Sequence, residues 1–144
     1  MELERYNDRD ERHVQVMQSW YIQKYIDKYT NKGVWRVLSL LGVCHSDLYM
    51  LIHEREVVGI VRIVSRSFGK YHDGQWIENV QILPGYQGKG YSKELMRLAI
   101  EKCRGKRVYL KVGNDNIIAR HLYEHVGFED VEVGKDERVM RCGL

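Results

Sequence analysis

A glycine-rich segment near the middle of the chain separates two stretches whose residue patterns indicate different secondary structures. The stretch before it, residues 76–83, is predicted to be a β-strand. After it, apolar residues from Leu95 to Cys103 recur at the spacing of a helix, which Gly105 should end. The connecting segment, residues 84–92, has the sequence PGYQGKGYS. A strand that passes through a tight turn directly into a helix favours an α/β domain, in which helices pack on a sheet.

The hydrophobic pattern predicts the remaining elements of this domain. In the first third of the chain, Asp8 or Asp10 can cap a helix whose apolar residues recur every three or four positions until Gly33. In chain order we expect a short strand near residues 3–6, this helix, a second helix over 34–41, hairpin strands over 48–53 and 57–64, the strand and helix described above, a strand over 107–112, a helix over 116–126, and strands over 128–133 and 137–142. We therefore predict one α/β domain over residues 1–144, a mixed and mostly antiparallel sheet flanked by helices.

Length, composition and charge exclude several classes of protein. A chain of 144 residues with 44% hydrophobic and 30% charged residues can bury a proper core, which excludes disorder, collagen and coiled coil. The net charge of +3 is mild and the Lys and Arg residues form no long run, so nucleic-acid binding is not expected. No stretch approaches the roughly 18 apolar residues of a membrane helix, and the charged N-terminus lacks the apolar core of a signal peptide. We therefore expect a cytoplasmic protein that does not enter a membrane.

The cysteines and histidines do not predict a metal site. Cys44, Cys103 and Cys142 are odd in number and far apart in the sequence, so we expect reduced thiols. His121 and His125 lie four residues apart on a predicted helix, but the sequence offers no nearby third ligand. We expect no metal.

The glycine-rich turn predicts a site for a diphosphate group. A helix N-terminus presents unpaired N–H groups and the positive end of the helix dipole. Gly88 and Gly90 allow the backbone to approach a ligand closely, and Gln87, Lys89 and Lys93 add hydrogen-bond donors. The alternative is a plain strand–helix turn in which the glycines only relieve strain. The segment matches neither the P-loop pattern nor the dinucleotide-binding pattern.

Two linked motifs resemble those of the GNAT superfamily of acyl-CoA-dependent N-acetyltransferases. Residues 80–92 are similar to the motif A of that family, whose pattern [QR]xxGx[GA] is met by Gln87 and Gly90, with Ser92 in place of the last glycine or alanine. Residues 116–128 resemble its motif B, which ends in a tyrosine followed by Gly-Phe. The resemblance is specific over residues 76–128 and implies the single-domain GNAT fold, with acetyl-CoA as co-substrate.

The resemblance also implies roles for individual residues. The strand backbone would pair with the pantetheine arm, the N–H of Val80 would face the thioester oxygen, and the diphosphate would lie on residues 88–93. Asn116 would bind the pantetheine, and Tyr123 would protonate the leaving thiolate; the two lie seven residues apart, which places them on one helix face. The implied cofactor-binding residues are Val80, Gln81, Ile82, Gln87, Gly88, Lys89, Gly90, Tyr91, Ser92, Lys93, Asn116 and Tyr123.

The incoming amine needs a base to remove its proton, and Glu78 is the best candidate. It precedes Val80 by two residues on the predicted strand, so both side chains should project from one face. A structural carboxylate is an equally good interpretation of Glu78, and His72 or water is the alternative base. Because no cysteine falls in either motif to carry the acyl group, we expect direct transfer in a ternary complex.

The acceptor is less well defined than the cofactor. The resemblance places its site at about residues 10–44 and 67–75, which are neither clearly acidic nor groove-like. A small amine, a protein N-terminus and a protein lysine all stay open, and so does a homodimer. A non-catalytic acyl-CoA-binding or protein-interaction module on the same fold is the alternative function, since fold does not fix function.

Overall fold

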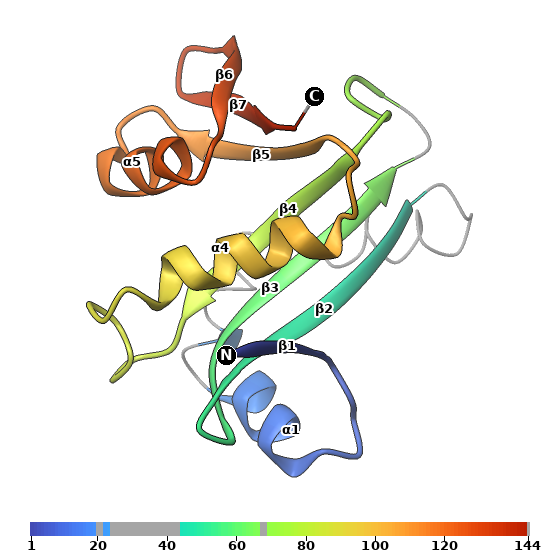
Figure 1. Cartoon of the computed structure of the whole chain (residues 1–144), viewed down its shortest axis with the longest axis vertical. Helices are drawn as coiled ribbons and strands as arrows, with labels where there is room; N and C mark the ends of the chain where they lie inside the picture. The colour runs from blue at the N-terminus through green and yellow to red at the C-terminus, as the bar shows by residue number, and fades with distance from the viewer. Residues whose placement is uncertain (20–21, 24–43, 67–68, 144) are drawn as a thin grey trace.

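The computed structural model describes residues 1–19, 22–23, 44–66 and 69–143. Its elements, labelled as in Figure 1, are β1 (Glu2–Arg5), α1 (Glu11–Gln18), β2 (Cys44–His53), β3 (Glu56–Arg66), β4 (Gln75–Ile82), α4 (Tyr91–Lys102), β5 (Val108–Gly113), α5 (Ile117–His125), β6 (Glu129–Val133) and β7 (Glu137–Cys142). This is the predicted order of strands and helices. The helix expected over residues 34–41 lies outside the described residues.

One seven-stranded sheet connects all of the strands, in the order β1-β2-β3-β4-β5-β7-β6. Every neighbouring pair is antiparallel except β4 and β5, which are parallel. Those two strands pair only through Gln75 with Val108 and Trp76 with Tyr109. Figure 1 shows them meeting at one end and then spreading apart. The mixed, mostly antiparallel α/β sheet is therefore confirmed, and it is open in the middle.

A β-bulge interrupts the pairing of β4 with β3. Ile60 pairs with Gln81 and Arg62 with Glu78, so two residues of β4, Asn79 and Val80, lie opposite one residue of β3. Asn79 has a left-handed φ of 53°, and its side-chain oxygen accepts a hydrogen bond from Nε of Arg62 at 3.1 Å. Asparagine is one of the few residues other than glycine that adopt this conformation readily. The bulge reverses which face of the sheet each later residue of β4 points to.

The two faces of the sheet are covered by different helices. Three residues of the α4 stripe, Leu95, Met96 and Ala99, are fully buried and pack in the main core. On the other face, Val16 and Met17 of α1 pack against a second apolar cluster of the sheet. Figure 1 shows α4 lying across the middle of the sheet and α1 at the end that holds β1. Among the described residues, no helix is long and apolar enough to cross a membrane.

The first helix begins as the sequence predicts but ends sooner. Asp10 is its N-cap and accepts a hydrogen bond from the N–H of Arg12 at 3.0 Å. Ser19 has an extended backbone, and its hydroxyl donates to the carbonyl of Val16 at 2.6 Å. A serine that bonds to the preceding turn competes with the helix, which explains why the apolar period does not continue as one helix through residue 19. Most of the predicted continuation lies outside the described residues.

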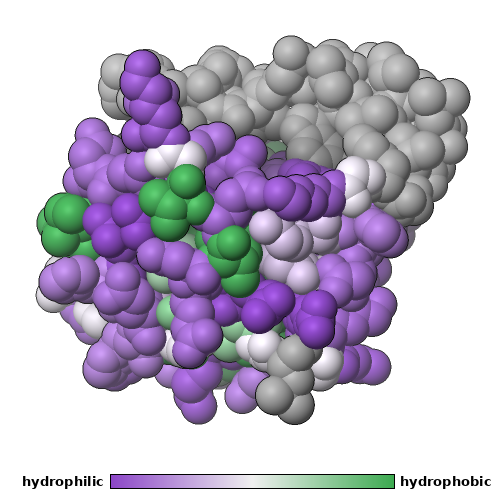
Figure 2. Space-filling view, turned by 90° about the horizontal axis from the view of Figure 1, so that it is seen from above, coloured by the Kyte–Doolittle hydropathy of each residue, from purple (hydrophilic) through white to green (hydrophobic). Residues whose placement is uncertain are grey.

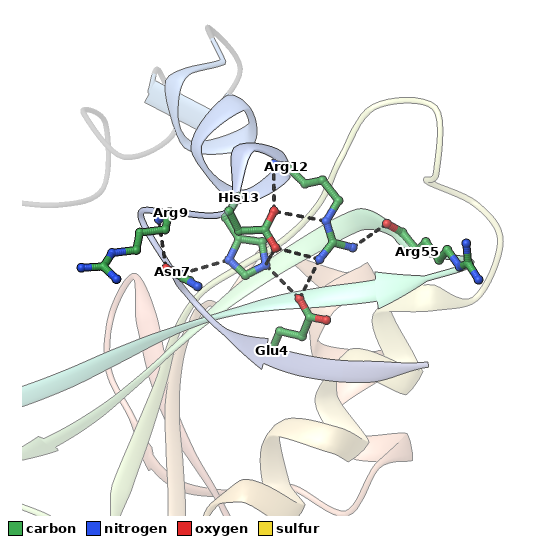
Figure 3. A network of polar contacts seen from close by, with 7 residues as sticks. Glu4, Asn7, Arg9, Arg12, His13 and Arg55 are labelled. Carbon is green, nitrogen blue, oxygen red and sulfur yellow. Dashed lines mark hydrogen bonds and ion pairs between the residues drawn. The ribbon is translucent and has the colours of Figure 1, made fainter.

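A polar cluster joins α1 to β1 and to the turn between β2 and β3 (Figure 3). The guanidinium of Arg12 donates to Glu4 at 3.1 Å, to Asp10 at 2.8 Å and to the carbonyl of Arg55 at 2.6 Å. His13 is 1% exposed, and its Nε2 lies 3.0 Å from the same Glu4 oxygen. Possible ligand atoms of Glu4, Asp10 and His13 lie within 4.8 Å of one another, but Arg12 already supplies a positive charge to both carboxylates. We interpret this cluster as structural, because it fixes α1 against the sheet.

Candidate active site

A cleft of about 820 Å³ lies where β4 and β5 spread apart, with α5 along one side. This volume falls within the usual range for sites that bind a small molecule or cofactor. Sequence-predicted residues that line the cleft are Glu78, Val80, Gln81, Ile82, Gln87, Ser92, Asn116 and Tyr123. The other predicted residues, Gly88, Lys89, Gly90, Tyr91 and Lys93, lie in the turn and first helical turn that adjoin it. The strand–turn–helix segment and α5, far apart in the sequence, therefore meet at one opening.

The turn before α4 has the backbone expected of an anion site. Gly85, Gly88 and Gly90 all have left-handed φ values, of 89°, 76° and 81°. Gly90 is the N-cap of α4, and within the described part of the chain no side chain caps that helix. The amide groups of the first turn therefore face solvent where an anion can reach them. The side-chain nitrogen of Gln87 donates to the carbonyl of Ile82 at 3.0 Å, which ties the turn to β4, while the residue also lines the cleft.

Tyr123 lies on the inner side of α5 and lines the cleft. Its ring packs edge-on against Phe128, with the ring centres 6.0 Å apart. Burial raises the pKa of the Tyr123 hydroxyl above its ordinary value, because the ionised form would lose hydration. In the described residues its hydroxyl has no hydrogen-bond partner, so it is available to a ligand. A protonated, partly buried hydroxyl at this position can act as a proton donor.

Asn116 also lines the cleft, from the N-cap position of α5. It is the N-cap of α5 and not a residue of the helix, and its side-chain oxygen accepts from the N–H of Ala119 at 3.3 Å. The predicted helix therefore begins one residue later than expected, and Asn116 and Tyr123 both line the cleft. With its oxygen committed to the cap, the side-chain N–H₂ of Asn116 is the group that remains to bind a ligand.

Helix α5 itself has no fully buried residue. Its partly buried side chains, including Ala119, Leu122 and Tyr123, contact the main core, while Ile118 is 87% exposed at the rim of the cleft. Figure 2, a view from above, shows a mostly hydrophilic surface on which a few apolar groups stand among polar ones. The helix is therefore held on one side only, and its other side borders open space.

Glu78 lines the cleft but does not share a face with Val80, so that prediction is wrong. Ile77 and Val80 both pack on the main core, because the bulge between Glu78 and Gln81 reverses the alternation. Glu78 instead lies on the side of Trp76, where Arg66 contacts both of them. The carboxylate is thus on the opposite face of the sheet from α4, at the same opening. His72, the alternative base, does not line the cleft; its Nδ1 lies 3.0 Å from the carbonyl of Gly69 in an exposed turn.

The other histidines with described side chains, and Cys103 and Cys142, do not line the cleft. His53 packs beside Tyr91, with ring centres 5.2 Å apart, and His45 is exposed near Asp47. Cys103 is buried and hydrogen-bonds to the carbonyl of Ala99, and burial raises its pKa to about 11. A thiol with such a pKa is protonated and unreactive at neutral pH.

A family model, described as the acetyltransferase (GNAT) family, matches residues 14–128. The chain belongs to the GNAT acetyltransferase family. The match includes both motifs, α5 and every cleft-lining residue except Glu137, so the resemblance indicated by the motifs is confirmed. The α/β fold of this family is confirmed as well.

Individual relatives and solved structures agree with this membership. The chain is 40% identical over 55 residues to the N-alpha-acetyltransferase RimI of Mycobacterium tuberculosis, covering 38% of this chain and 35% of that protein. It is 37% identical over 60 residues to the spermine/spermidine N(1)-acetyltransferase of Bacillus subtilis, covering 38% of each. The chain thus spans little more than a third of the length of these curated relatives. A GNAT family acetyltransferase from Elizabethkingia anophelis, solved with acetyl-CoA bound, has the same fold, with a TM-score of 0.66 at 14% identity over 99% of this chain and 97% of that one.

Proposed function

We propose that this protein transfers an acetyl group from acetyl-CoA to a primary amine by direct attack in a ternary complex. The observation that supports this most is the single cleft at which the glycine-rich turn, the bulge of β4 and Tyr123 meet. The turn can bind a diphosphate, and the open edge of β4 can pair with the extended pantetheine arm. The Tyr123 hydroxyl can donate a proton to the leaving thiolate.

The described residues suit acetyl-CoA in charge and shape. The N–H groups at the start of α4, together with Lys89 and Lys93, would hold the diphosphate. Beyond Trp76 no described strand pairs with the edge of β4 that faces β5, so the amides of a pantetheine arm can add there as a short strand would. The side-chain N–H₂ of Asn116, at the start of α5, would contact the same arm.

Three groups of this chain would carry the chemical step. The thioester supplies an acyl carbon that the amine attacks, with the thiol of CoA as leaving group. Glu78 would accept a proton from the amine, and the N–H of Val80 would donate a hydrogen bond to the carbonyl oxygen as negative charge develops on it. Tyr123 would donate its proton to the sulfur. One C–N bond forms and one C–S bond breaks. From the neutral amine, the proton taken by Glu78 balances the one given by Tyr123, and an amine that arrives protonated releases one further proton to water.

The acceptor would be a primary amine on a small molecule or a protein. The names of two relatives indicate both classes, because one is an N-alpha-acetyltransferase and the other a spermine/spermidine acetyltransferase. Of the residues expected to select between them, most of 10–44 lies outside the described residues, whereas 69–75 are described. A cytoplasmic location remains our expectation, and the oligomeric state stays open.

A two-part experiment tests the proposed function. Calorimetry first measures acetyl-CoA binding, and thiol release is then followed with small amines, peptides with free N-termini, and peptides with an internal lysine. We expect micromolar-range binding and amine-dependent release of CoA. Binding without transfer to any amine would instead identify the non-catalytic acyl-CoA-binding module.

Gly90→Val should weaken acetyl-CoA binding at least about tenfold, or about 1.4 kcal/mol. A Cβ at Gly90 would meet no atom within 4 Å, so a steric collision within the free protein would not cause this loss. The left-handed φ of 81° is instead the constraint, because a β-branched residue rarely adopts it and the turn would rearrange.

Calorimetric titration with acetyl-CoA measures this loss of affinity, and two further variants separate backbone strain from collision with the ligand. Asparagine tolerates the left-handed conformation. If the Gly90→Asn variant loses as much affinity for acetyl-CoA as the Gly90→Val variant, the cause is a collision of the side chain with the bound diphosphate. Gly105→Val places the same strain, at φ 78°, at the other end of α4 and should leave affinity unchanged. Unchanged affinity in a folded Gly90→Val protein would show that the turn is only a connector.

A further inference from the structure

We propose that Arg66 is a positioning residue that holds the Glu78 carboxylate in the orientation needed to accept the proton of the amine. This inference rests on the proposed function, in which Glu78 is the general base. The two residues lie on neighbouring strands, Arg66 at the end of β3 and Glu78 in the middle of β4. They are twelve residues apart in the sequence and are brought together only by the pairing of the two strands.

Arg66 contacts Glu78 and Trp76 at the same time. Its Nη2 donates to Oε1 of Glu78 at 2.6 Å, and its guanidinium carbon lies 4.5 Å from the centre of the Trp76 ring. Each of the two charged side chains is 26% exposed, so the ion pair is partly shielded from water. A charge-assisted hydrogen bond combined with stacking on an aromatic ring restrains a long side chain far more than an exposed ion pair does.

The ring beneath Arg66 is itself fixed by its neighbours. Trp76 is 4% exposed, its Nε1 donates to the carbonyl of Tyr71 at 3.3 Å, and its ring stacks on Tyr109 with centres 5.5 Å apart. The Tyr109 hydroxyl donates to Asp73 at 2.8 Å. A packed aromatic cluster thus sets the position of the guanidinium, which in turn sets the position of the carboxylate.

The contact engages only one of the two oxygens of Glu78. Within the described part of the chain, Arg66 is the one partner of this carboxylate, through Oε1. Oε2 is therefore the oxygen that can accept the proton of an amine in the cleft. Glutamate has several rotatable bonds, and a base that is held in one rotamer keeps its reactive oxygen in place during attack. Arg66 thus acts through Glu78 and does not need to touch the acceptor.

The test compares the steady-state kinetics of variants at both positions. Arg66→Gln should lower kcat about tenfold while the KM for the amine and the calorimetric affinity for acetyl-CoA stay within about twofold. Arg66→Lys keeps a positive charge and should recover much of the rate. In a Glu78→Gln background, Arg66→Gln should cause no further loss, because the residue acts only through Glu78. Arg97→Gln removes a partner of Glu94 on the exposed side of α4 and serves as the matched control.

The outcomes separate a positioning role of Arg66 from a structural role and from failure of the proposed function. A wild-type rate in Arg66→Gln, or a loss that persists in full in the Glu78→Gln background, would overturn the positioning role while leaving the proposed function intact. A loss that Arg66→Lys does not relieve, accompanied by a lower melting temperature, would assign Arg66 a structural role and also overturn the proposal. If the wild type binds acetyl-CoA but acetylates no amine, the proposed function fails, and the positioning role fails with it.

Discussion

Glu78→Gln should lower kcat/KM for the acceptor amine by about 10²–10⁴-fold and leave the affinity for acetyl-CoA unchanged. The substitution keeps the shape of the side chain and removes its ability to accept a proton. At neutral pH most of a primary amine is protonated and needs a base, whereas at higher pH it is already neutral. The deficit should therefore shrink as the pH rises. Rates measured from pH 7 to pH 10, with saturating acetyl-CoA, check this expectation.

The cleft itself offers a matched control for this prediction. Glu137 also lines it and pairs with Lys111 at 3.4 Å, so Glu137→Gln removes a carboxylate of the same cleft without removing the proposed base. That variant should keep its rate within a few fold. A loss in Glu78→Gln that is equal at every pH, or no loss at all, would remove Glu78 from the role. Since His72 lies outside the cleft lining, water would then be the stronger alternative.

Tyr123→Phe should slow the chemical step by about 10–10³-fold with little change in cofactor affinity. The variant lacks one hydroxyl and keeps the ring that packs against Phe128. Because burial raises the pKa of Tyr123, the wild-type hydroxyl stays protonated through neutral pH and ionises only above the ordinary tyrosine range. The wild-type rate should therefore fall only at strongly alkaline pH, and this decline should be absent from the variant. Single-turnover rates against pH measure both effects.

Two controls show whether the hydroxyl of Tyr123 donates a proton or only positions the thioester. A thioester with a more acidic leaving thiol needs less protonation, so the deficit of the variant should narrow with it. An equal deficit with both thioesters would contradict proton donation. Tyr109→Phe removes a second hydroxyl whose pKa is raised by burial, outside the cleft, and the alkaline decline should persist there.

Much of the fold and of the cleft follows from local patterns in the sequence. Hydrophobic period and glycine positions are short-range signals, and they predict α4, its stripe of Leu95, Met96 and Ala99, and the left-handed turn at Gly88 and Gly90. The two motifs lie on the segments that the fold brings to one opening. These features depend on residues that are close in the sequence, so one amino-acid sequence is enough to predict them.

The missed features depend on pairing between distant segments. Strand alternation places Glu78 and Val80 on one face, but the pairing of β3 with β4 inserts an extra residue at Asn79 and separates them. An asparagine inside a β-branched strand was the available signal, since it tolerates a positive φ. The contact of Arg66 with Glu78 has no local signal, because it arises from strand pairing across twelve residues.

The lack of a fully buried residue in α5 has a consequence for how tightly a ligand can bind. A helix without a fully buried residue should open locally at a lower free-energy cost than α4, in which Leu95, Met96 and Ala99 are fully buried. A ligand in the cleft would add contacts to the cleft-lining residues of α5, and part of the interaction free energy would go into ordering the helix. Affinity and local order are then coupled, so substitutions that rigidify α5 from its outer face would tighten binding without touching the ligand.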